Sequence, residues 1–251
     1  MRDALLAIEG LSKRYGALAV SDDVTLDIAR GETHALIGPN GAGKTTLIHQ
    51  LSGLLPSDRG RVLLDGEDIS QIDMARRVKK GLARSFQITS ILAGYTVLEN
   101  VALAVQARSG SSFRFLQPAA QERELNEAAM RSLAQVGLEP RAGVRAGSLS
   151  HGEKRLLELA IAIATAPKVL LLDEPLAGLG PEESRAVIAM LGRLKSAFTI
   201  VLVEHDMDAV FALADRISVL VYGRIIATGT PAQIAADEAV RAAYLGTAEA
   251  A

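Results

Sequence analysis

Eight consecutive residues near position 40 have the composition of a phosphate-binding loop. The segment 38–45 reads Gly-Pro-Asn-Gly-Ala-Gly-Lys-Thr and satisfies G-x-x-x-x-G-K-[ST] between an expected strand and an expected helix. Its glycines allow a backbone whose amides point inward at phosphate oxygens, and the helix N-terminus adds a positive partial charge. Lys44 would reach the β- and γ-phosphates, and the Thr45 hydroxyl would ligate Mg²⁺. The residues expected to hold the phosphates are Gly38, Pro39, Asn40, Gly41, Ala42, Gly43, Lys44, Thr45 and Thr46.

Two adjacent acids, Asp173 and Glu174, follow a continuous apolar run. In parallel α/β sheets ligands gather at the carboxyl ends of the strands, which places such acids beside the phosphate loop. Asp173 is suited to hold Mg²⁺ through water, and Glu174 to act as the general base on an attacking water. Neighbouring residues of a strand point to opposite sides, so their roles should differ. The alternative interpretation is that both acids only cap the strand or the next turn.

The expected elements place these residues at strand and helix ends. Apolar runs bounded by turn residues predict strands, the first two of them antiparallel, at 5–8, 24–28, 33–37, 61–64, 169–172, 198–203, 216–221 and 224–228. Helical periodicity predicts helices at 44–54, 96–108, 119–136, 152–164, 181–195 and 238–245. The chain is therefore expected to be an α/β protein interrupted by a block of helices, with a loop at 109–118.

Composition limits the classes of function. The chain has 251 residues, 49% of them hydrophobic and 22% charged, and a formal net charge of −2, which argues against a general nucleic-acid binder. It contains no cysteine, so disulfides and thiolate metal sites are excluded, and a reducing cytosol fits. No apolar run is long enough to span a bilayer, and the apolar segment 4–8 is too short for a signal peptide. Work at a membrane would therefore require docking to another protein.

Residues 149–155, Leu-Ser-His-Gly-Glu-Lys-Arg, resemble the LSGGQ signature of the ABC ATPases, at a similar distance before the carboxylate strand. The resemblance implies that this segment faces the γ-phosphate of a nucleotide held by another protomer. Ser150 and the backbone amide of Gly152, at a helix start, would form the anion site. The segment departs from the family pattern at His151 and Glu153. An acid at a helix start is favourable when it points away from the phosphate, and that orientation is expected for Glu153.

Other positions match family motifs in the expected order. Gln87 matches the Q-loop glutamine, which implies contact with Mg²⁺ or water and sensing of a membrane partner. His205 matches the switch histidine, which implies a bond to the γ-phosphate, although a histidine at a strand end is usually structural. Tyr15 resembles the aromatic that stacks on adenine, with a packing tyrosine as the alternative. Gly180 stands where the D-loop of the family usually has Asp or Asn. A separate metal site around His205 is disfavoured, since no second His or Cys lies nearby.

The resemblance implies a P-loop NTPase of the ABC ATPase fold, with a mixed, mainly parallel core sheet, an antiparallel N-terminal subsheet and an inserted helical subdomain. One nucleotide-binding domain would span 1–251, with its core at 1–87 and 166–251 and its helical subdomain at 88–165. The implied catalytic residues are Lys44, Gln87, Glu174 and His205; Thr45, Gln87 and Asp173 would serve Mg²⁺; and the cofactors are ATP and Mg²⁺.

A narrower likeness is to the ATP-binding subunits of branched-chain amino acid importers, the LivG-like group. The segments 84–87, 177–181, 203–207 and 243–246 carry it. It implies permease subunits, a second ATP-binding subunit in a homo- or heterodimer, a periplasmic solute-binding protein as an indirect partner, and a peripheral position on the cytoplasmic face of the inner membrane. Relatives of this group also serve urea and amides, so the solute stays open, and import follows from the resemblance alone.

Three other functions remain open at this stage. A soluble ABC ATPase acting on ribosomes or DNA usually has paired cassettes or a long coiled-coil insertion, and this sequence has neither. A P-loop kinase or GTPase leaves Ser150, Glu174 and His205 without a role, and no Asn-Lys-x-Asp guanine-reading segment is present. The altered signature also admits a regulatory cassette that does not hydrolyse ATP.

Overall fold

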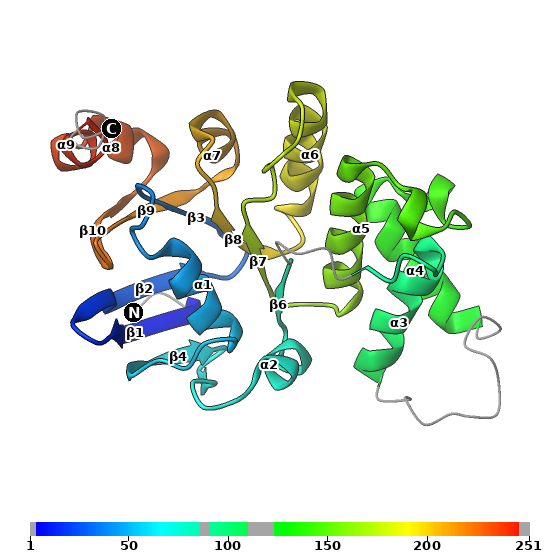
Figure 1. Ribbon diagram of the computed structural model, residues 1–251, viewed down its shortest axis with the longest axis horizontal. Coiled ribbons are helices and arrows are strands. Elements are labelled where there is room, and N and C mark those ends of the chain that lie inside the picture. Colours follow the sequence, from blue (N-terminus) through cyan, green and yellow to red (C-terminus); the bar gives the residue numbers. More distant parts are fainter. Residues whose placement is uncertain (1–3, 86–90, 110–122, 246–251) are drawn as a thin grey trace.

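The computed structural model describes residues 4–85, 91–109 and 123–245, and it contains two sheets with helices around them (Figure 1). The larger sheet has six strands in the order β10-β9-β3-β8-β7-β6. All its neighbouring strands are parallel except β10, which pairs antiparallel with β9 at the edge. The strands are β3 (Thr33–Ile37), β6 (Leu82–Arg84), β7 (Val169–Asp173), β8 (Thr199–Val203), β9 (Arg216–Val221) and β10 (Arg224–Gly229).

The register of the three central strands aligns their carboxyl ends. Leu36 of β3 pairs with Val203 of β8, and Val203 lies opposite Asp173 of β7. Every residue of these strands is buried, as expected for strands covered on both faces, and in β3 this includes the polar side chains of Thr33 and His34. The segments that follow β3, β7 and β8 therefore leave the sheet at one edge, and these segments carry Lys44, Glu174 and His205.

The smaller sheet is antiparallel, in the order β2-β1-β4-β5, which confirms the expected N-terminal subsheet. Its strands are β1 (Ala4–Tyr15), β2 (Leu18–Ala29), β4 (Arg59–Leu64) and β5 (Glu67–Asp68). Both β1 and β2 are longer than predicted, and the turn is confined to Gly16 and Ala17. Register shifts between Ile8 and Leu11 and between Leu11 and Lys13 interrupt the alternation on which the strand prediction depends.

Helices surround the two sheets. They are α1 (Lys44–Ser52), α2 (Met74–Lys80), α3 (Val97–Ser109), α4 (Arg123–Val136), α5 (His151–Ala164), α6 (Pro181–Leu194), α7 (Met207–Leu213), α8 (Pro231–Ala236) and α9 (Glu238–Leu245). The predicted helix 44–54 ends early because Gly53, at φ 80°, terminates α1. Positions 119–122 of another predicted helix lie outside the described residues. The sequence analysis missed α2, α7 and α8, which have only six or seven residues each, and the short strands β5 and β6.

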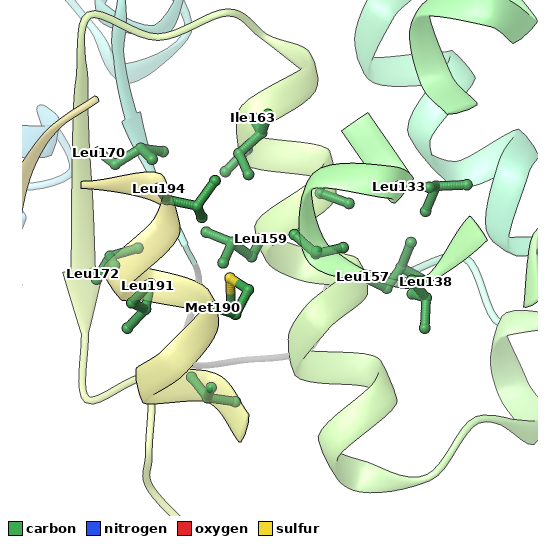
Figure 2. Packing of buried hydrophobic residues seen from close by; sticks show 14 of the residues in the cluster. Leu133, Leu138, Leu157, Leu159, Ile163, Leu170, Leu172, Met190, Leu191 and Leu194 are labelled. Atoms are coloured by element: carbon green, nitrogen blue, oxygen red, sulfur yellow. The ribbon is translucent and has the colours of Figure 1, made fainter. Parts of the chain in front are cut away.

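Helices α3, α4 and α5 pack together beside the six-stranded sheet (Figure 1). Of these three helices, α5 lies nearest the sheet, and α3 and α4 lie on its far side. Figure 2 shows Leu159 and Ile163 of α5 facing Leu194 of α6, while Leu157 faces Leu133 of α4. One continuous apolar cluster thus joins the helical block to β7 and α6, which sets the position of α5 relative to the carboxyl end of β7. Among the described residues, no helix is both long and apolar enough to cross a membrane.

Arg77 of α2 anchors the C-terminal end of α1, the helix that begins at the phosphate loop. Its side chain is only 3% exposed, and its Nη1 donates to the carbonyls of Gln50 and Leu51 at 2.8 and 2.7 Å. The remaining donors bind the carbonyls of Ile72 and Ser70 at 3.0 and 2.8 Å. The Gln50 carbonyl also accepts from the amide of Gly53, so Arg77 matters most for the carbonyl of Leu51, an acceptor in the last turn of α1.

Replacing this guanidinium should destabilise the fold. Arg77→Met keeps an aliphatic chain but removes four hydrogen bonds to backbone carbonyls, and we expect a loss of about 3 kcal/mol in the free energy of unfolding, measured by urea denaturation. The matched control is Arg76→Met, whose side chain is 73% exposed and which should change stability by less than about 0.5 kcal/mol. Equal stabilities for the two variants would show that Arg77 does not anchor α1.

Candidate nucleotide-binding and hydrolysis site

The loop 38–45 is pressed against the rest of the fold on one side. A Cβ on Gly38 would lie 2.1 Å from the carbonyl oxygen of Leu220, and a Cβ on Gly43 would lie 2.3 Å from that of Val20. Both glycines also have positive φ, at 156° and 105°. Only glycine fits both positions, because any side chain would collide with a neighbouring backbone. The backbone conformation of the loop that joins β3 to α1 thus requires glycine at 38 and 43.

Lys44 curls back into this loop. Its Nζ donates to the carbonyls of Gly38 and Pro39 at 2.6 and 3.1 Å. Burial lowers the pKa of Lys44, while the nearby carboxylates of Glu174 and Asp173 oppose that shift. The charge of Lys44 is therefore close enough to interact with both acids. Lys44, Asp173 and Glu174 are the residues that the sequence predicted to share one site.

Asp173, the last residue of β7, is paired with a cation that the sequence analysis did not assign. Arg84 Nη2 lies 2.8 Å from Asp173 Oδ2, and the two side chains are 5% and 1% exposed. Arg84 ends β6, which lies beside β7 in the sheet. The parallel pairing of β6 with β7 thus places the buried guanidinium of Arg84 beside the buried carboxylate of Asp173.

The oxygen donors expected for Mg²⁺ fit that ion. Within the described part of the chain, neither Asp173 Oδ1 nor the hydroxyl of Thr45 has a hydrogen-bond partner, and Thr45 is exposed in the first turn of α1. A carboxylate and a hydroxyl are hard oxygen ligands of the kind that Mg²⁺ takes, with water and substrate phosphates filling the remaining positions. Gln87, the third expected ligand, lies outside the described residues.

The backbone turns sharply at Glu174. This residue has φ 48°, a left-handed conformation that costs a non-glycine residue about 1 to 3 kcal/mol. Its amide donates to the carbonyl of Val203 at 2.8 Å, and its own carbonyl accepts from the amide of Ala177 at 3.1 Å. The guanidinium of Arg155 also donates to the Glu174 carbonyl. The surroundings thus hold this residue in a turn that separates it from the strand ending at Asp173.

Glu204 fastens the loops after β7 and β8 to each other. Its carboxylate is 1% exposed and accepts from the amides of Leu176, His205 and Asp206 at 2.9, 3.0 and 3.4 Å. His205 itself is 68% exposed, with Nδ1 3.7 Å from Glu204 Oε2. The described residues contain no group of three or more His, Asp or Glu side chains arranged to hold a metal ion. Glu204 therefore has a structural task, while His205 presents its ring at the edge where β3 and β7 also end.

Tyr15 lies at the open end of the β1–β2 hairpin. Its side chain is 55% exposed, and Lys13 Nζ lies 5.8 Å from its ring centroid. Tyr15 pairs with Leu18, two residues before the Val20 carbonyl that packs on Gly43. The hairpin end is thus attached beside the phosphate loop, with a ring face available for stacking.

The segment 149–155 forms the capped start of α5. Ser150 Oγ accepts from the amide of Glu153 at 3.2 Å, and the Glu153 carboxylate accepts from the amide of Ser150 at 2.8 Å. The other Glu153 oxygen lies 2.9 Å from Arg141 Nε. The carboxylate of Glu153 is thus engaged within its own chain, which agrees with the orientation expected from the sequence.

The start of α5 also adjoins the segment that follows Glu174. A Cβ on Gly152 would lie 2.8 Å from Glu183 Oε1, and His151 Nε2 lies 3.4 Å from the Cβ position of Gly178. The absence of a side chain at Gly152 therefore leaves room for Glu183 of α6, and its absence at Gly178 leaves room for the ring of His151.

Three residues of this region were missed as contributors, namely Arg84, Arg155 and Glu204. The i,i+3 pairing of Arg155 with Glu158 along a helix face is a signal that could have marked Arg155. The contacts of Arg84 and Glu204 depend on which strands are neighbours, and their local sequence holds no such signal.

Comparisons with known proteins agree with this arrangement. A family model described as ABC transporter matches residues 21–177, and one described as branched-chain amino acid ATP-binding cassette transporter matches residues 224–250. The high-affinity branched-chain amino acid transport ATP-binding protein BraF of Pseudomonas aeruginosa is 37% identical over 99% of this chain and 100% of its own length. The lipopolysaccharide export system ATP-binding protein LptB of Escherichia coli is 34% identical over 97% of this chain and 98% of its own.

Solved structures give the same result. A crystal structure of an ATP-binding cassette of an ABC transporter in its ADP conformation matches with a TM-score of 0.85 at 31% identity, over 97% of this chain and 99% of that one. A nucleotide-free cassette of an ABC transporter matches with a TM-score of 0.83 at 30% identity, over 96% and 98%. These matches confirm the fold expected from the sequence. The chain belongs to the ABC transporter family of ATP-binding cassettes.

Proposed function

We propose that this chain is the ATP-binding and ATP-hydrolysing subunit of an importer for branched-chain amino acids. Lys44, Asp173 and Glu174 gathered at one sheet edge carry the assignment of hydrolysis. The match of residues 224–250 to the branched-chain family model supports the choice of solute. Identity alone separates BraF from the exporter subunit LptB by only three percentage points, 37% against 34%, so the C-terminal match is the more informative observation.

The residues of the proposed site divide the work of phosphoryl transfer to water. Lys44 and the amides of loop 38–46 would bind the β- and γ-phosphates, while Thr45 and Asp173 would hold Mg²⁺. Bound Mg²⁺ would neutralise charge that develops on the phosphates of the substrate ATP. Glu174 would accept the proton of the attacking water at its carboxylate, and His205 would donate to the γ-phosphate.

Three further residues complete the proposed site. Tyr15 would stack on the adenine. Gln87 would contact the Mg²⁺ or the attacking water. Ser150 and the amide of Gly152, at the start of the 14-residue helix α5, would come from a second ATP-binding subunit, identical or similar. ATP would then form part of the interface between the two subunits. Binding of ATP would favour the closed dimer, and hydrolysis of ATP would allow the dimer to open.

The permease subunits would dock on the helical side of the domain. We divide the single domain 1–251 into a core, 1–87 and 166–251, and a helical subdomain, 88–165. A mostly apolar cavity of about 160 Å³ between α2, β6 and α5 supports this assignment. Val78 and Ile161 contribute apolar surface to it, and Arg84 also lines it. An apolar permease segment seated here would lie against Arg84, the partner of Asp173. The chain would work as a peripheral subunit on the cytoplasmic face of the membrane, and a periplasmic binding protein would deliver the solute.

Removing the proposed general base should separate binding from hydrolysis. Glu174→Gln keeps the size of the side chain but cannot accept a proton, so phosphate release should fall by roughly 10²- to 10⁴-fold while ATP binding persists. Equilibrium binding of ATP and phosphate release on the same preparation provide the measurement. Glu182→Gln, an exposed residue at the start of α6, is the matched control and should retain the parental rate. Undiminished phosphate release by Glu174→Gln would remove Glu174 from this role.

A charge in the proposed docking cavity should uncouple the chain from its membrane partners. Ile161→Glu adds a carboxylate to a mostly apolar lining, and association with vesicles that contain the permease subunits should fall by about tenfold or more. Ile226→Glu in β10, where the native side chain is 41% exposed, is the control and should leave association unchanged. Co-sedimentation with the vesicles gives the readout, and ATP binding by the free chain should be equal in both variants. Full association of Ile161→Glu would place the docking surface elsewhere.

A further inference from the structure

Arg155 of α5 binds the backbone at the carboxyl end of β7. Its Nη2 donates to the carbonyl of Asp173 at 3.2 Å and to that of Glu174, while its Nε donates to the carbonyl of Pro175 at 3.2 Å. Three successive carbonyl groups around the proposed general base thus converge on one guanidinium. Arg155 lies in the second turn of the helix that begins with the signature-like segment. One side chain therefore joins that helix to the backbone of Glu174.

The guanidinium is itself held in place. Arg155 Nη1 donates to Glu158 Oε2 at 3.1 Å, and the two side chains are only 13% and 8% exposed. The apolar residues Leu159 and Ile163 of α5 pack against α6, while Leu157 packs against α4 (Figure 2). Arg155 therefore joins the turn at Glu174 to a helix that packs on both α4 and α6.

The backbone conformation of Glu174 must be stabilised by its surroundings. Its left-handed backbone, at φ 48°, persists only where the surroundings determine it. The Glu174 amide is bound by the Val203 carbonyl, whereas the carbonyl side of the turn is bound by Ala177 and Arg155. Arg155 thus ties this turn to a helix outside the sheet.

We propose that Arg155 is a positioning residue for hydrolysis. It sets the turn at Glu174 according to the position of α5, the signature helix, which begins with the segment 149–155. The proposal rests on the function proposed above, in which Ser150 of a chain binds the nucleotide held by its partner while Glu174 acts on the nucleotide held by its own loop. Arg155 then connects the two nucleotide sites of a dimer through a single chain. A signature helix seated on one ATP would favour the productive turn at the other, which would make hydrolysis cooperative.

Lysine cannot replace arginine in this task. The three carbonyls and Glu158 take separate donors of one planar, rigid guanidinium, whereas an ammonium is a single point at the end of a flexible chain. Arg155→Lys keeps the charge and the pairing with Glu158 but loses the simultaneous grip on the turn. It is therefore the informative variant, and it carries less risk of misfolding than a neutral replacement.

The test compares Arg155→Lys with the parent chain and with Arg193→Lys, the same change on an exposed arginine of α6. We expect kcat to fall by about tenfold or more, since small displacements of a reacting group carry large rate penalties. The Hill coefficient for ATP should fall toward one. The Kd for ATP and the melting temperature should stay close to those of the parent. Unchanged kcat and Hill coefficient, or a fall in kcat accompanied by an equal loss of ATP affinity, would overturn the proposal.

A second measurement separates positioning from a general structural effect. In the Glu174→Gln background the group to be positioned is absent, so adding Arg155→Lys should lower the residual rate by less than about twofold. An undiminished effect in that background would show that Arg155 acts elsewhere. If the parent chain failed to hydrolyse ATP, the proposed function would fall and this inference with it. If the parent hydrolysed ATP and Arg155→Lys matched it, only this inference would fall.

Discussion

The parallel register of β3, β8 and β7 is the constraint on which the rest of the structure depends. Because Leu36, Val203 and Asp173 lie at one level, the chain leaves the sheet three times at the same edge. Burial lowers the pKa of Lys44, and the two nearby acids oppose that shift, so the edge gathers charges that stabilise one another. A triphosphate with its metal ion would enter a site whose cation and anions are already close together.

The contacts around that edge explain how the fold tolerates its local strain. Glu204 binds the loops after β7 and β8, Arg84 neutralises Asp173, and Arg155 holds the left-handed turn at Glu174. These three side chains are buried or nearly so: Glu204 and Arg155 bind backbone groups, and Arg84 pairs with the carboxylate of Asp173. The exposed side chains of Tyr15 and His205 lie on the rims of the same region and remain available to a ligand. The division suits a site in which a rigid support positions a few accessible groups.

Sequence reasoning succeeded where the signal is local. Apolar runs predicted β7 and β8, the strand at 33–37 was also expected, and the glycine spacing predicted the phosphate loop with Lys44 at the start of α1. It failed for α2, α7 and α8, since elements of six or seven residues hold too little periodicity, and for the full length of β1, where register shifts break the alternation. The partnership of Arg84 with Asp173 spans 89 residues, so it depends on strand order that no local pattern encodes.

In the proposed dimer, the edge formed by β3, β7 and β8 would be one half of an ATP site, and the start of α5 of a second chain would supply the other half. The sequence has no cysteine, so introduced thiols give no background. Cysteines placed at Asn40 and His151 in the Glu174→Gln chain can be treated with a short bismaleimide to test this arrangement. We expect a covalent dimer that forms with Mg²⁺ and ATP and not with ADP. A parent chain that hydrolyses ATP, combined with a cross-linking yield that is the same with and without ATP, would contradict it.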